Sequence, residues 1–329
     1  MAKTTTRFIR NSETSTWREC RLKWYLTFIL GFQSNRVNPH FWLGTLVHLA
    51  LSEWYLGNVP NPAHFFWEIA NETLSQMRTE KITAEGVDLD LDNLADLDKF
   101  LLVGVAMLEG YEDWDKENRD FDVIDSELSY YIDLEDANGT PFTFVGRFDI
   151  LTENSEGIRV RDFKTAADFR AMTTIHTDMQ FRRYPWMVRA AHPKWKDQVV
   201  GSMWLGLRKI VPSGRSKPPY FNRVLIDLTE GEFEQVEREV KAEAADMIGV
   251  EQDLALGSTD PRDFIYPSPS VDCSWRCDFF KNGLCSLWRA GTDNVTDFGQ
   301  GYGNWGNDPY KEYREDFDGA VTIGLSEGG

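Results

Sequence analysis

Two strand-like segments of this chain carry charged side chains where a buried strand ordinarily carries apolar ones. The segment RVRDFKTA (159–166) contains Asp162 and Lys164, and the segment FVGRFDIL (144–151) contains Asp149. Side chains alternate between the two faces of a strand, so Asp162 and Lys164 share one face. Two converging carboxylates are unfavourable unless a positive charge lies between them. The pattern therefore predicts that Asp149 and Asp162 hold a divalent cation such as Mg²⁺, which prefers oxygen ligands.

Lys164 has two interpretations in this pattern. It can orient a metal-bound water or stabilise charge that develops on a phosphate. From one strand alone, a buried Asp–Lys ion pair without chemistry is the simpler interpretation. The next segment, TDMQFRRYPWMV, favours the catalytic interpretation over the simple ion pair. Gln180 and Tyr184 are four residues apart in it and share a helix face. Both side chains can bind a phosphate or a base, although a surface Gln and a half-buried Tyr are common.

The order of the expected elements predicts an α/β fold with a helical N-terminal region. Apolar periodicity predicts helices over 15–31, 41–57, 62–79 and 93–118, then a change to strand-like alternation. The later expected elements are strands over 121–134, 141–151, 157–165, 198–210 and 220–228, and helices over 172–191 and 229–250. We expect a helical region over 1–120, a core over 121–228, a helix and cysteine segment over 229–290, and a flexible acidic tail over 291–329.

Taken alone, the net charge of −18 argues against a nucleic-acid-binding protein, because phosphate contacts need Lys and Arg. The charge is uneven, however. Residues 1–36 have a net charge of +5, residues 85–136 of −15, and the tail from residue 291 of −6. Basic patches on an acidic protein can still bind DNA, and we expect those of 1–36 and Arg182 and Arg183 to do so. Solubility alone also explains the acidic surface.

The chain has no apolar run long enough to span a membrane and no apolar segment typical of a signal peptide. We therefore expect a cytoplasmic protein without a membrane partner. It also lacks the G-x-x-x-x-G-K-[ST] motif of an ATP-driven motor. A helicase that works with it would be a separate polypeptide.

The four cysteines are placed as one plus three. Cys20 lies near the N-terminus, whereas Cys273, Cys277 and Cys285 lie in CSWRCDFFKNGLC. Zinc sites more often show two pairs of closely spaced ligands, and disulfides are rare in a reducing compartment. The set suits Cys₄ ligation of an iron–sulfur cluster. A zinc-stabilised scaffold, or unrelated buried thiols, is the alternative.

Taken in order, "GRFD", "RDFKT" and "QFRRY" resemble the PD-(D/E)XK nuclease superfamily in its RecB-like branch. The resemblance covers about residues 121–210 and implies a mixed central sheet flanked by helices. It implies that Lys164 positions the attacking water and that Gln180 and Tyr184 orient the substrate. Pro185, directly after Tyr184, departs from the pattern and predicts a kink.

The resemblance adds further site residues. An upstream helix of this branch often supplies a metal-binding His, and His48 in LGTLVHLAL matches it; taken alone, His48 would more often be a core histidine. Glu127 matches an acid that often lies near the site. The implied ligands of Mg²⁺ or Mn²⁺ are Asp149, Asp162, His48 and the backbone carbonyl of Phe163.

The cysteines also resemble those of the iron–sulfur RecB-like nucleases, which include the AddB nuclease domain and CRISPR-associated adaptation exonucleases. In these proteins one Cys precedes the core and three follow it, so that a [4Fe-4S] cluster ties the C-terminal segment to the N-terminal helix. The implied role of Cys20, Cys273, Cys277 and Cys285 is structural.

Two functions follow from different classes. The first is a metal-dependent deoxyribonuclease, most simply an exonuclease on single strands or duplex ends, in recombination, repair or phage DNA processing. Its partner would be a separate helicase or recombination protein, and homo-oligomers are known in the family. The second is a DNA- or partner-binding protein with a nuclease-like fold that does not cut. The intact Asp149, Asp162 and Lys164 set favours the enzyme.

Overall fold

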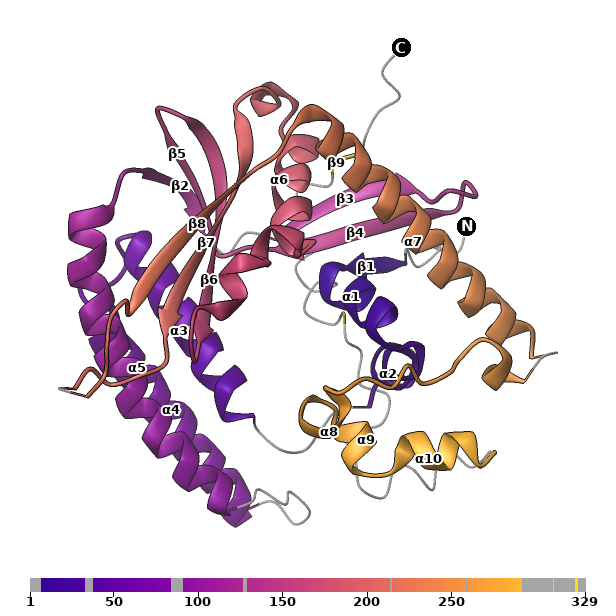
Figure 1. The fold of residues 1–329 in the computed structure, drawn as a ribbon, viewed down its shortest axis with the longest axis horizontal. Helices are drawn as coiled ribbons and strands as arrows, with labels where there is room; N and C mark the ends of the chain where they lie inside the picture. The colour runs from indigo at the N-terminus through magenta and orange to yellow at the C-terminus, as the bar shows by residue number, and fades with distance from the viewer. Residues whose placement is uncertain are drawn as a thin grey trace. The chain divides into compact units, whose positions relative to one another are not determined.

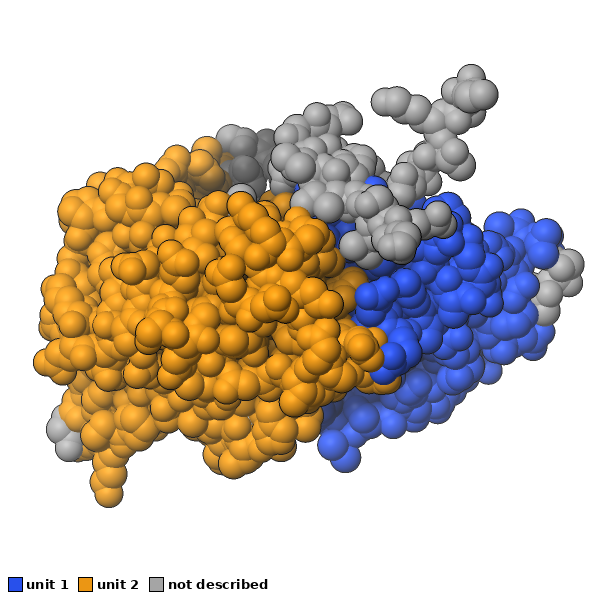
Figure 2. Space-filling model, turned by 90° about the horizontal axis from the view of Figure 1, so that it is seen from above, with its two compact units in different colours: residues 1–35, 131–145, 237–329 blue, residues 36–130, 146–236 orange. Residues whose placement is uncertain are grey.

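The computed structural model describes residues 7–32, 38–83, 91–126, 129–213, 215–257, 260–291, 310 and 323–324 of the chain. They belong to two compact units, coloured separately in Figure 2. Unit 1 comprises residues 1–35, 131–145 and 237–329, and unit 2 comprises residues 36–130 and 146–236. Each unit is assembled from segments that lie far apart in the sequence.

Unit 2 is built on a five-stranded mixed sheet in the order β2-β5-β6-β7-β8. Its strands are β2 Asp122–Ser126, β5 Ile150–Asn154, β6 Gly157–Ala166, β7 Val199–Arg208 and β8 Phe221–Asp227. Only β6 and β7 are parallel, and their crossover runs through α6, Gln180–Ala191. Strand β7 reads as a long apolar run because helices cover both faces of the sheet, whereas β6 carries charged side chains among its apolar ones.

Three helices pack on one face of this sheet: α3 Pro39–Tyr55, α4 Pro62–Thr83 and α5 Leu91–Asn118 (Figure 1). Their apolar side chains share a core with Phe163 of β6 and with Met203, Leu205 and Leu207 of β7. On the other face, Phe181 of α6 packs with Trp204. Asp162 pairs with Trp204 across the two strands, so Asp162 and Lys164 lie on this second face, as strand alternation predicts.

Helix α3 has a clear start signal. The Asn38 side chain accepts a hydrogen bond from the His40 N–H at 2.9 Å, and Pro39 occupies the first helical position. Further along the helix, a Cβ added to Gly44 would lie 3.5 Å from Thr165 Oγ1, so α3 passes close to β6 at this residue. The helix therefore carries His48 past the strand that holds Asp162 and Lys164.

Helix α6 continues through Pro185. A proline has no N–H to donate to the carbonyl four residues earlier, which here belongs to Phe181. The buried Ser202 hydroxyl of β7 donates to that carbonyl at 2.7 Å. A side chain of the sheet thus replaces the hydrogen bond that Pro185 removes.

Unit 1 has a four-stranded sheet in the order β1-β4-β3-β9. Its strands are β1 Phe8–Arg10, β3 Ser129–Glu135, β4 Pro141–Arg147 and β9 Ile323–Gly324, the ends of β3 and β4 reaching into unit 2. Its helices are α1 Asn11–Glu19, α2 Arg21–Trp24 with a π-helical turn over Tyr25–Ile29, α8 Cys273–Arg276, α9 Asp278–Lys281, α10 Leu284–Arg289 and the C-terminal part of α7 Glu230–Leu256.

Three sequence predictions of elements were wrong in detail. The helix expected over 15–31 is interrupted at Cys20, whose backbone is extended with φ −163°. The strands expected over 121–134 and 141–151 each divide into two, and their halves join different sheets. The helix expected from residue 172 begins at Gln180, after two short 3-10 turns. Hydrophobic pattern alone does not show where a chain changes sheets.

Most of the acidic tail lies outside the described residues. The prediction that this tail is flexible therefore concerns residues that the structure does not describe. Tyr310 is described and buried: it packs with Phe8, Tyr131 and Val145, and its hydroxyl donates to the Glu13 carboxylate. In the described ranges no helix has the length and apolarity needed to cross a bilayer.

Candidate functional site

The site forms in unit 2 around Asp149, which follows β4 and precedes β5. Only 8% of its surface is exposed. One carboxylate oxygen lies 3.1 Å from Nδ1 of His48, and the other accepts the backbone N–H of Phe163. These two partners come from α3 and from β6, so a helix and a strand together fix the orientation of the Asp149 carboxylate.

Asp162, Lys164 and Gln180 form the second half of the site. The Lys164 ammonium lies 2.5 Å from Oδ2 of Asp162 and donates to Gln180 Oε1 at 3.2 Å. The Gln180 amide in turn donates to Oδ1 of Asp162 at 2.7 Å. Gln180 is the first residue of α6, so the crossover helix closes a ring of polar contacts over strand β6.

The charges of these groups depend on one another. Burial lowers the pKa of His48, but the charge and hydrogen bond of Asp149 outweigh it, so this pKa is raised. Burial favours a protonated Asp149, yet His48, Lys164 and the Phe163 N–H together hold its pKa below the usual value. Burial raises the pKa of Asp162 to about 6, Lys164 opposing and the Asp149 charge adding to the effect. Of these two carboxylates, Asp162 is therefore the one whose negative charge is less well compensated.

Asp162 offers the clearest test of whether a divalent cation fits here. Its Oδ2 atom is buried and has the Lys164 ammonium 2.5 Å away, and its Oδ1 atom accepts the Gln180 amide N–H. A buried carboxylate is costly unless a cation compensates it, and here Lys164 supplies that positive charge. Among the described residues no three His, Cys, Asp or Glu side chains are already placed around one point as ligands. The donor types fit Mg²⁺ or Mn²⁺, with Lys164 and Gln180 on the Asp162 oxygens.

Two serines that the sequence did not single out support Asp149 from behind. The Ser126 hydroxyl, at the end of β2, donates to the Asp149 main-chain carbonyl at 2.8 Å. Ser52 Oγ lies 2.6 Å from Ser126 Oγ, and both side chains are buried. Ser52 follows His48 by one helical turn, so α3 contacts both the side chain and, through Ser126, the main chain of Asp149. The four-residue spacing in HLALS was a signal for Ser52, whereas Ser126 had none.

Tyr184 lies beside this network. It is half-buried on α6, one turn beyond Gln180, and its ring centroid is 5.5 Å from that of Phe148. A Cβ on Gly146 would lie 2.8 Å from Met187 Sδ and 3.3 Å from Tyr184 Cε1, so a glycine here lets α6 approach β4. Phe163, expected as a carbonyl ligand, contributes its N–H to Asp149. Glu127 lies outside the described residues.

The basic residues expected to hold DNA are placed differently from the prediction. Arg183 is fully buried, so it is not available to a phosphate backbone. Arg182 is 3.8 Å from Glu232. In unit 1, Arg7 pairs with both Glu13 and Glu251, Arg18 with Glu243 and Lys23 with Glu19. Much of the positive charge of residues 1–36 is therefore neutralised by carboxylates of the same unit.

The four cysteines gather in unit 1. Burial, followed by repulsion from the sulfurs of the other three cysteines, raises the pKa of Cys285 to about 11. Main-chain N–H groups approach three of the sulfurs: Ser268 donates to Cys20 at 3.4 Å, Ser270 to Cys273 at 3.3 Å, and Phe279 and Phe280 to Cys277. The described residues hold no ready three-ligand group, but four neighbouring sulfurs with N–H donors fit Cys₄ ligation.

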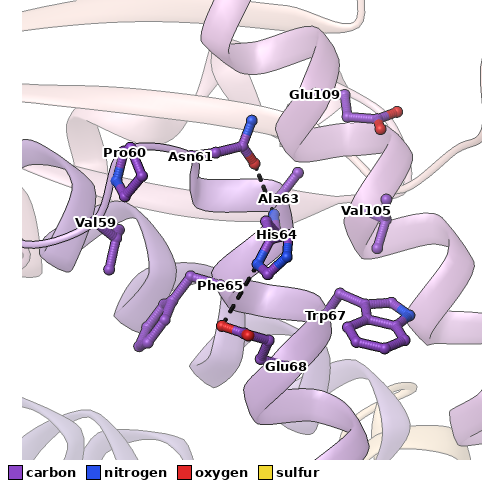
Figure 3. A pocket seen from close by; sticks show the side chains of 10 residues that line it. All are labelled: Val59, Pro60, Asn61, Ala63, His64, Phe65, Trp67, Glu68, Val105 and Glu109. Carbon is purple, nitrogen blue, oxygen red and sulfur yellow. Dashed lines mark hydrogen bonds and ion pairs between the residues drawn. The ribbon is translucent and has the colours of Figure 1, made fainter.

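A separate hollow of about 640 Å³ lies along α4 and α5 (Figure 3). It is lined by apolar side chains, including the exposed Trp67, and by His64, Glu68 and Glu109. His64 points toward Glu68, at 3.5 Å. None of the residues described above lines it, and its two carboxylates would repel phosphate. We do not assign it to the same chemistry.

Comparison with known proteins agrees with this geometry. The chain matches the family model of the PD-(D/E)XK nuclease superfamily over residues 11–279. No curated protein matches it. A solved structure described as "Crystal structure of SSO0001" is similar over 69% of this chain and 82% of that one, at 12% identity and a TM-score of 0.26, which is too low to compare the two folds. Members of the superfamily are typically metal-dependent nucleases. The family match spans most of the chain and includes every residue of the network around Asp149 and Asp162, so this protein belongs to the PD-(D/E)XK nuclease superfamily.

Proposed function

We propose that this protein is a Mg²⁺- or Mn²⁺-dependent deoxyribonuclease that degrades DNA from single-stranded or duplex ends. The observation that carries the proposal is the convergence of His48, Asp149, Asp162, Lys164 and Gln180 in one network from α3, β6, α6 and the segment between β4 and β5. The intact set of Asp149, Asp162 and Lys164 favours cleavage over a protein that binds DNA without cutting it.

Each residue of the network has a separate proposed role in phosphodiester hydrolysis. Asp149, Asp162 and His48, with the Phe163 carbonyl, would hold the divalent ion, which supplies Lewis-acid activation. Lys164 would orient the attacking water and stabilise charge on the scissile phosphate. Gln180 accepts a hydrogen bond from Lys164 and donates one to Asp162, which fixes the two side chains relative to each other. Tyr184 would contact the substrate strand.

A cleavage assay with Lys164→Ala tests the proposal. We expect the variant to lose cleavage of end-labelled linear DNA by about a hundredfold or more in Mn²⁺ while it still binds DNA. Lys196→Ala, which removes an exposed lysine before β7, is the matched control and should cut normally. A circular single strand that resists digestion would identify an exonuclease.

Two outcomes would contradict this assignment. Normal cleavage by Lys164→Ala would exclude the proposed role of the lysine. An unaltered protein that binds DNA yet leaves linear DNA intact in both Mg²⁺ and Mn²⁺ would favour the alternative of a non-cleaving binding protein.

We also propose that Cys20, Cys273, Cys277 and Cys285 bind a structural [4Fe-4S] cluster. The support is their gathering in unit 1 and the N–H donors at three of the sulfurs. Anaerobic purification should give a brown protein with about four irons and four sulfides per chain. Cys285→Ser should lose the colour and lower the thermal midpoint, whereas the neighbouring Ser286→Ala should keep both. A colourless protein that contains zinc would disprove the cluster.

A further inference from the structure

The connection between β7 and β8 has an unusual charge for this chain. Residues 208–217, RKIVPSGRSK, hold four basic side chains and no carboxylate, although the whole chain has a net charge of −18. We refer to these residues as the basic loop; all but residue 214 are described. A local excess of positive charge on an acidic molecule marks a place where an anionic partner is favoured.

The basic groups of this loop keep their charge uncompensated. Elsewhere in the described residues, exposed bases commonly pair with acids, as Arg78 does with Asp98. Arg208 instead donates to the carbonyls of Ala167 and Lys217, and no ion pair joins the loop's four bases to a carboxylate in the described part of the chain. Arg170 binds Asp168 at 2.5 Å and is the main cause of the lowered pKa of that carboxyl, to which the Arg208 charge adds a smaller contribution. Positive charge therefore remains available at this surface.

Two further carboxylates lie past the end of the basic loop. Asp113 and Glu117 of α5 line a groove together with residues 218–221. They face the prolines and aromatic rings that follow the loop, so they limit the positive surface to residues 208–217. A polyanion that follows the charge would therefore run from the loop toward β6 rather than toward α5.

The basic loop starts at the edge of the sheet where Lys164 lies. Strands β6 and β7 are parallel, with Lys164 paired to Gly206 and Ala166 paired to Arg208. Arg208 is thus two residues, or about 7 Å, further along the strand than the partner of Lys164. The Lys209 N–H then donates to the Ala166 carbonyl at 2.7 Å, which fixes the first residues of the loop against the end of β6.

An exposed aromatic ring flanks the basic loop. Nζ of Lys209 lies 3.1 Å from Nδ1 of His40 in the first turn of α3, and the next residue, Phe41, is 75% exposed. Phe41 precedes His48 by seven residues, which places both on one side of the helix about 10 Å apart along its axis. Exposed aromatic rings beside basic groups are the surfaces on which unpaired bases stack.

We propose that the basic loop and Phe41 bind the unpaired DNA strand that leads to the site: Arg215 and Lys217 contact its backbone, and Phe41 stacks on a base. This inference rests on the proposed nuclease function. It assigns substrate binding to the β7–β8 connection in place of Arg183, which is buried, and of Arg7, Arg18 and Lys23, which pair with carboxylates. It also makes a single strand the preferred substrate, because Phe41 has no access to a base within a duplex.

A binding measurement in EDTA separates this inference from catalysis. Fluorescence anisotropy of a labelled single-stranded oligonucleotide is measured with the full-length protein at increasing salt. For Arg215→Gln/Lys217→Gln we expect binding to weaken about tenfold at low salt, and the salt slope to fall by about 1.4, as for the loss of two phosphate contacts. Lys194→Gln/Lys196→Gln makes the same charge change at the opposite end of β7 and should leave both quantities unchanged.

Phe41→Ala tests the stacking part of the same surface. We expect it to weaken single-strand binding about fivefold or more, with the salt slope unchanged and binding to a blunt duplex unaffected. Equal effects of Arg215→Gln/Lys217→Gln and Lys194→Gln/Lys196→Gln on binding would contradict the role of the basic loop. An equal loss of single-strand and duplex binding by Phe41→Ala would contradict the stacking role of Phe41. Either result would leave the nuclease assignment intact. If the unaltered protein neither binds nor cuts DNA, both proposals fail.

Discussion

At the scale of single residues, the site shows how little of its support is visible in a sequence. Asp149, Asp162 and Lys164 could be identified because charge in apolar segments is conspicuous, and Gln180 because it lies one helical turn before Tyr184. Ser126, which holds the main chain of Asp149, is an ordinary serine at the end of a strand and gave no signal. Contacts between segments far apart in the chain depend on the fold, so a single sequence does not reveal them.

His192 carries a prediction at the same scale. Burial, with the Lys194 charge adding to it, lowers the pKa of this imidazole, whose Nε2 lies 3.2 Å from the Tyr130 hydroxyl. Between the folded pKa and the unfolded value of about 6.5, the unfolded chain binds more protons, so the free energy of unfolding falls as the pH decreases through this window.

The expected result is a difference between variants in urea unfolding at pH 7.5 and about 5.5. His192→Gln removes the titration, so its stability should fall less on acidification than that of the unaltered protein. His176→Gln changes an exposed histidine and should retain the full loss. An identical loss in His192→Gln would show that His192 does not contribute to the acid sensitivity.

At the scale of elements, helix α6 illustrates how tertiary contacts override a local signal. The helix runs from Gln180 to Ala191 with Pro185 inside it, and Ser202 of β7 supplies the donor to Phe181 that the proline lacks. The first turn of this helix holds Gln180 over Asp162. The position of a polar side chain in the site thus depends on a hydroxyl on the neighbouring strand.

Ser202→Ala should destabilise the protein by about 1–3 kcal/mol, because it leaves the Phe181 carbonyl buried without a donor. Pro185→Ala restores a main-chain N–H at the position that normally donates to this carbonyl. The double variant Ser202→Ala/Pro185→Ala should therefore recover much of the loss in urea unfolding. A double variant as unstable as Ser202→Ala would contradict this account of the helix.

The predicted elements around α6 also show which features a sequence specifies. Helices with a sustained apolar period, such as α3 and α5, were predicted within a few residues of their observed ends. The segment 141–151 was predicted as one strand, because nothing in its alternation marks Phe148 and Asp149 as the passage between two sheets. Asp149 lies in that passage. The sequence predicted the chemical role of Asp149 but not that the chain leaves one sheet and enters another at this residue.

At the scale of the whole molecule, net charge was a poor guide to binding. The value of −18 argues against nucleic acid, and the basic segment 1–36 seemed the natural exception. Ion pairs within unit 1 neutralise Arg7, Arg18 and Lys23, whereas the basic loop of unit 2 has no such partners among the described residues. The uncompensated charge, and not the sum over a segment, indicates where a polyanion binds.

Because unit 1 includes segments from both ends of the sequence, its residues are synthesised partly before and partly after those of unit 2. Every member of the network around Asp149 and Asp162 has left the ribosome's catalytic centre once Gln180 has been added, and unit 2 ends at residue 236. Of the four cysteines of unit 1, Cys20 precedes every residue of this network in the chain, whereas Cys273, Cys277 and Cys285 follow all of them. A growing chain therefore contains every residue of this network before the last three cysteines have been added, so the proposed cluster can be completed only after the network residues have been made.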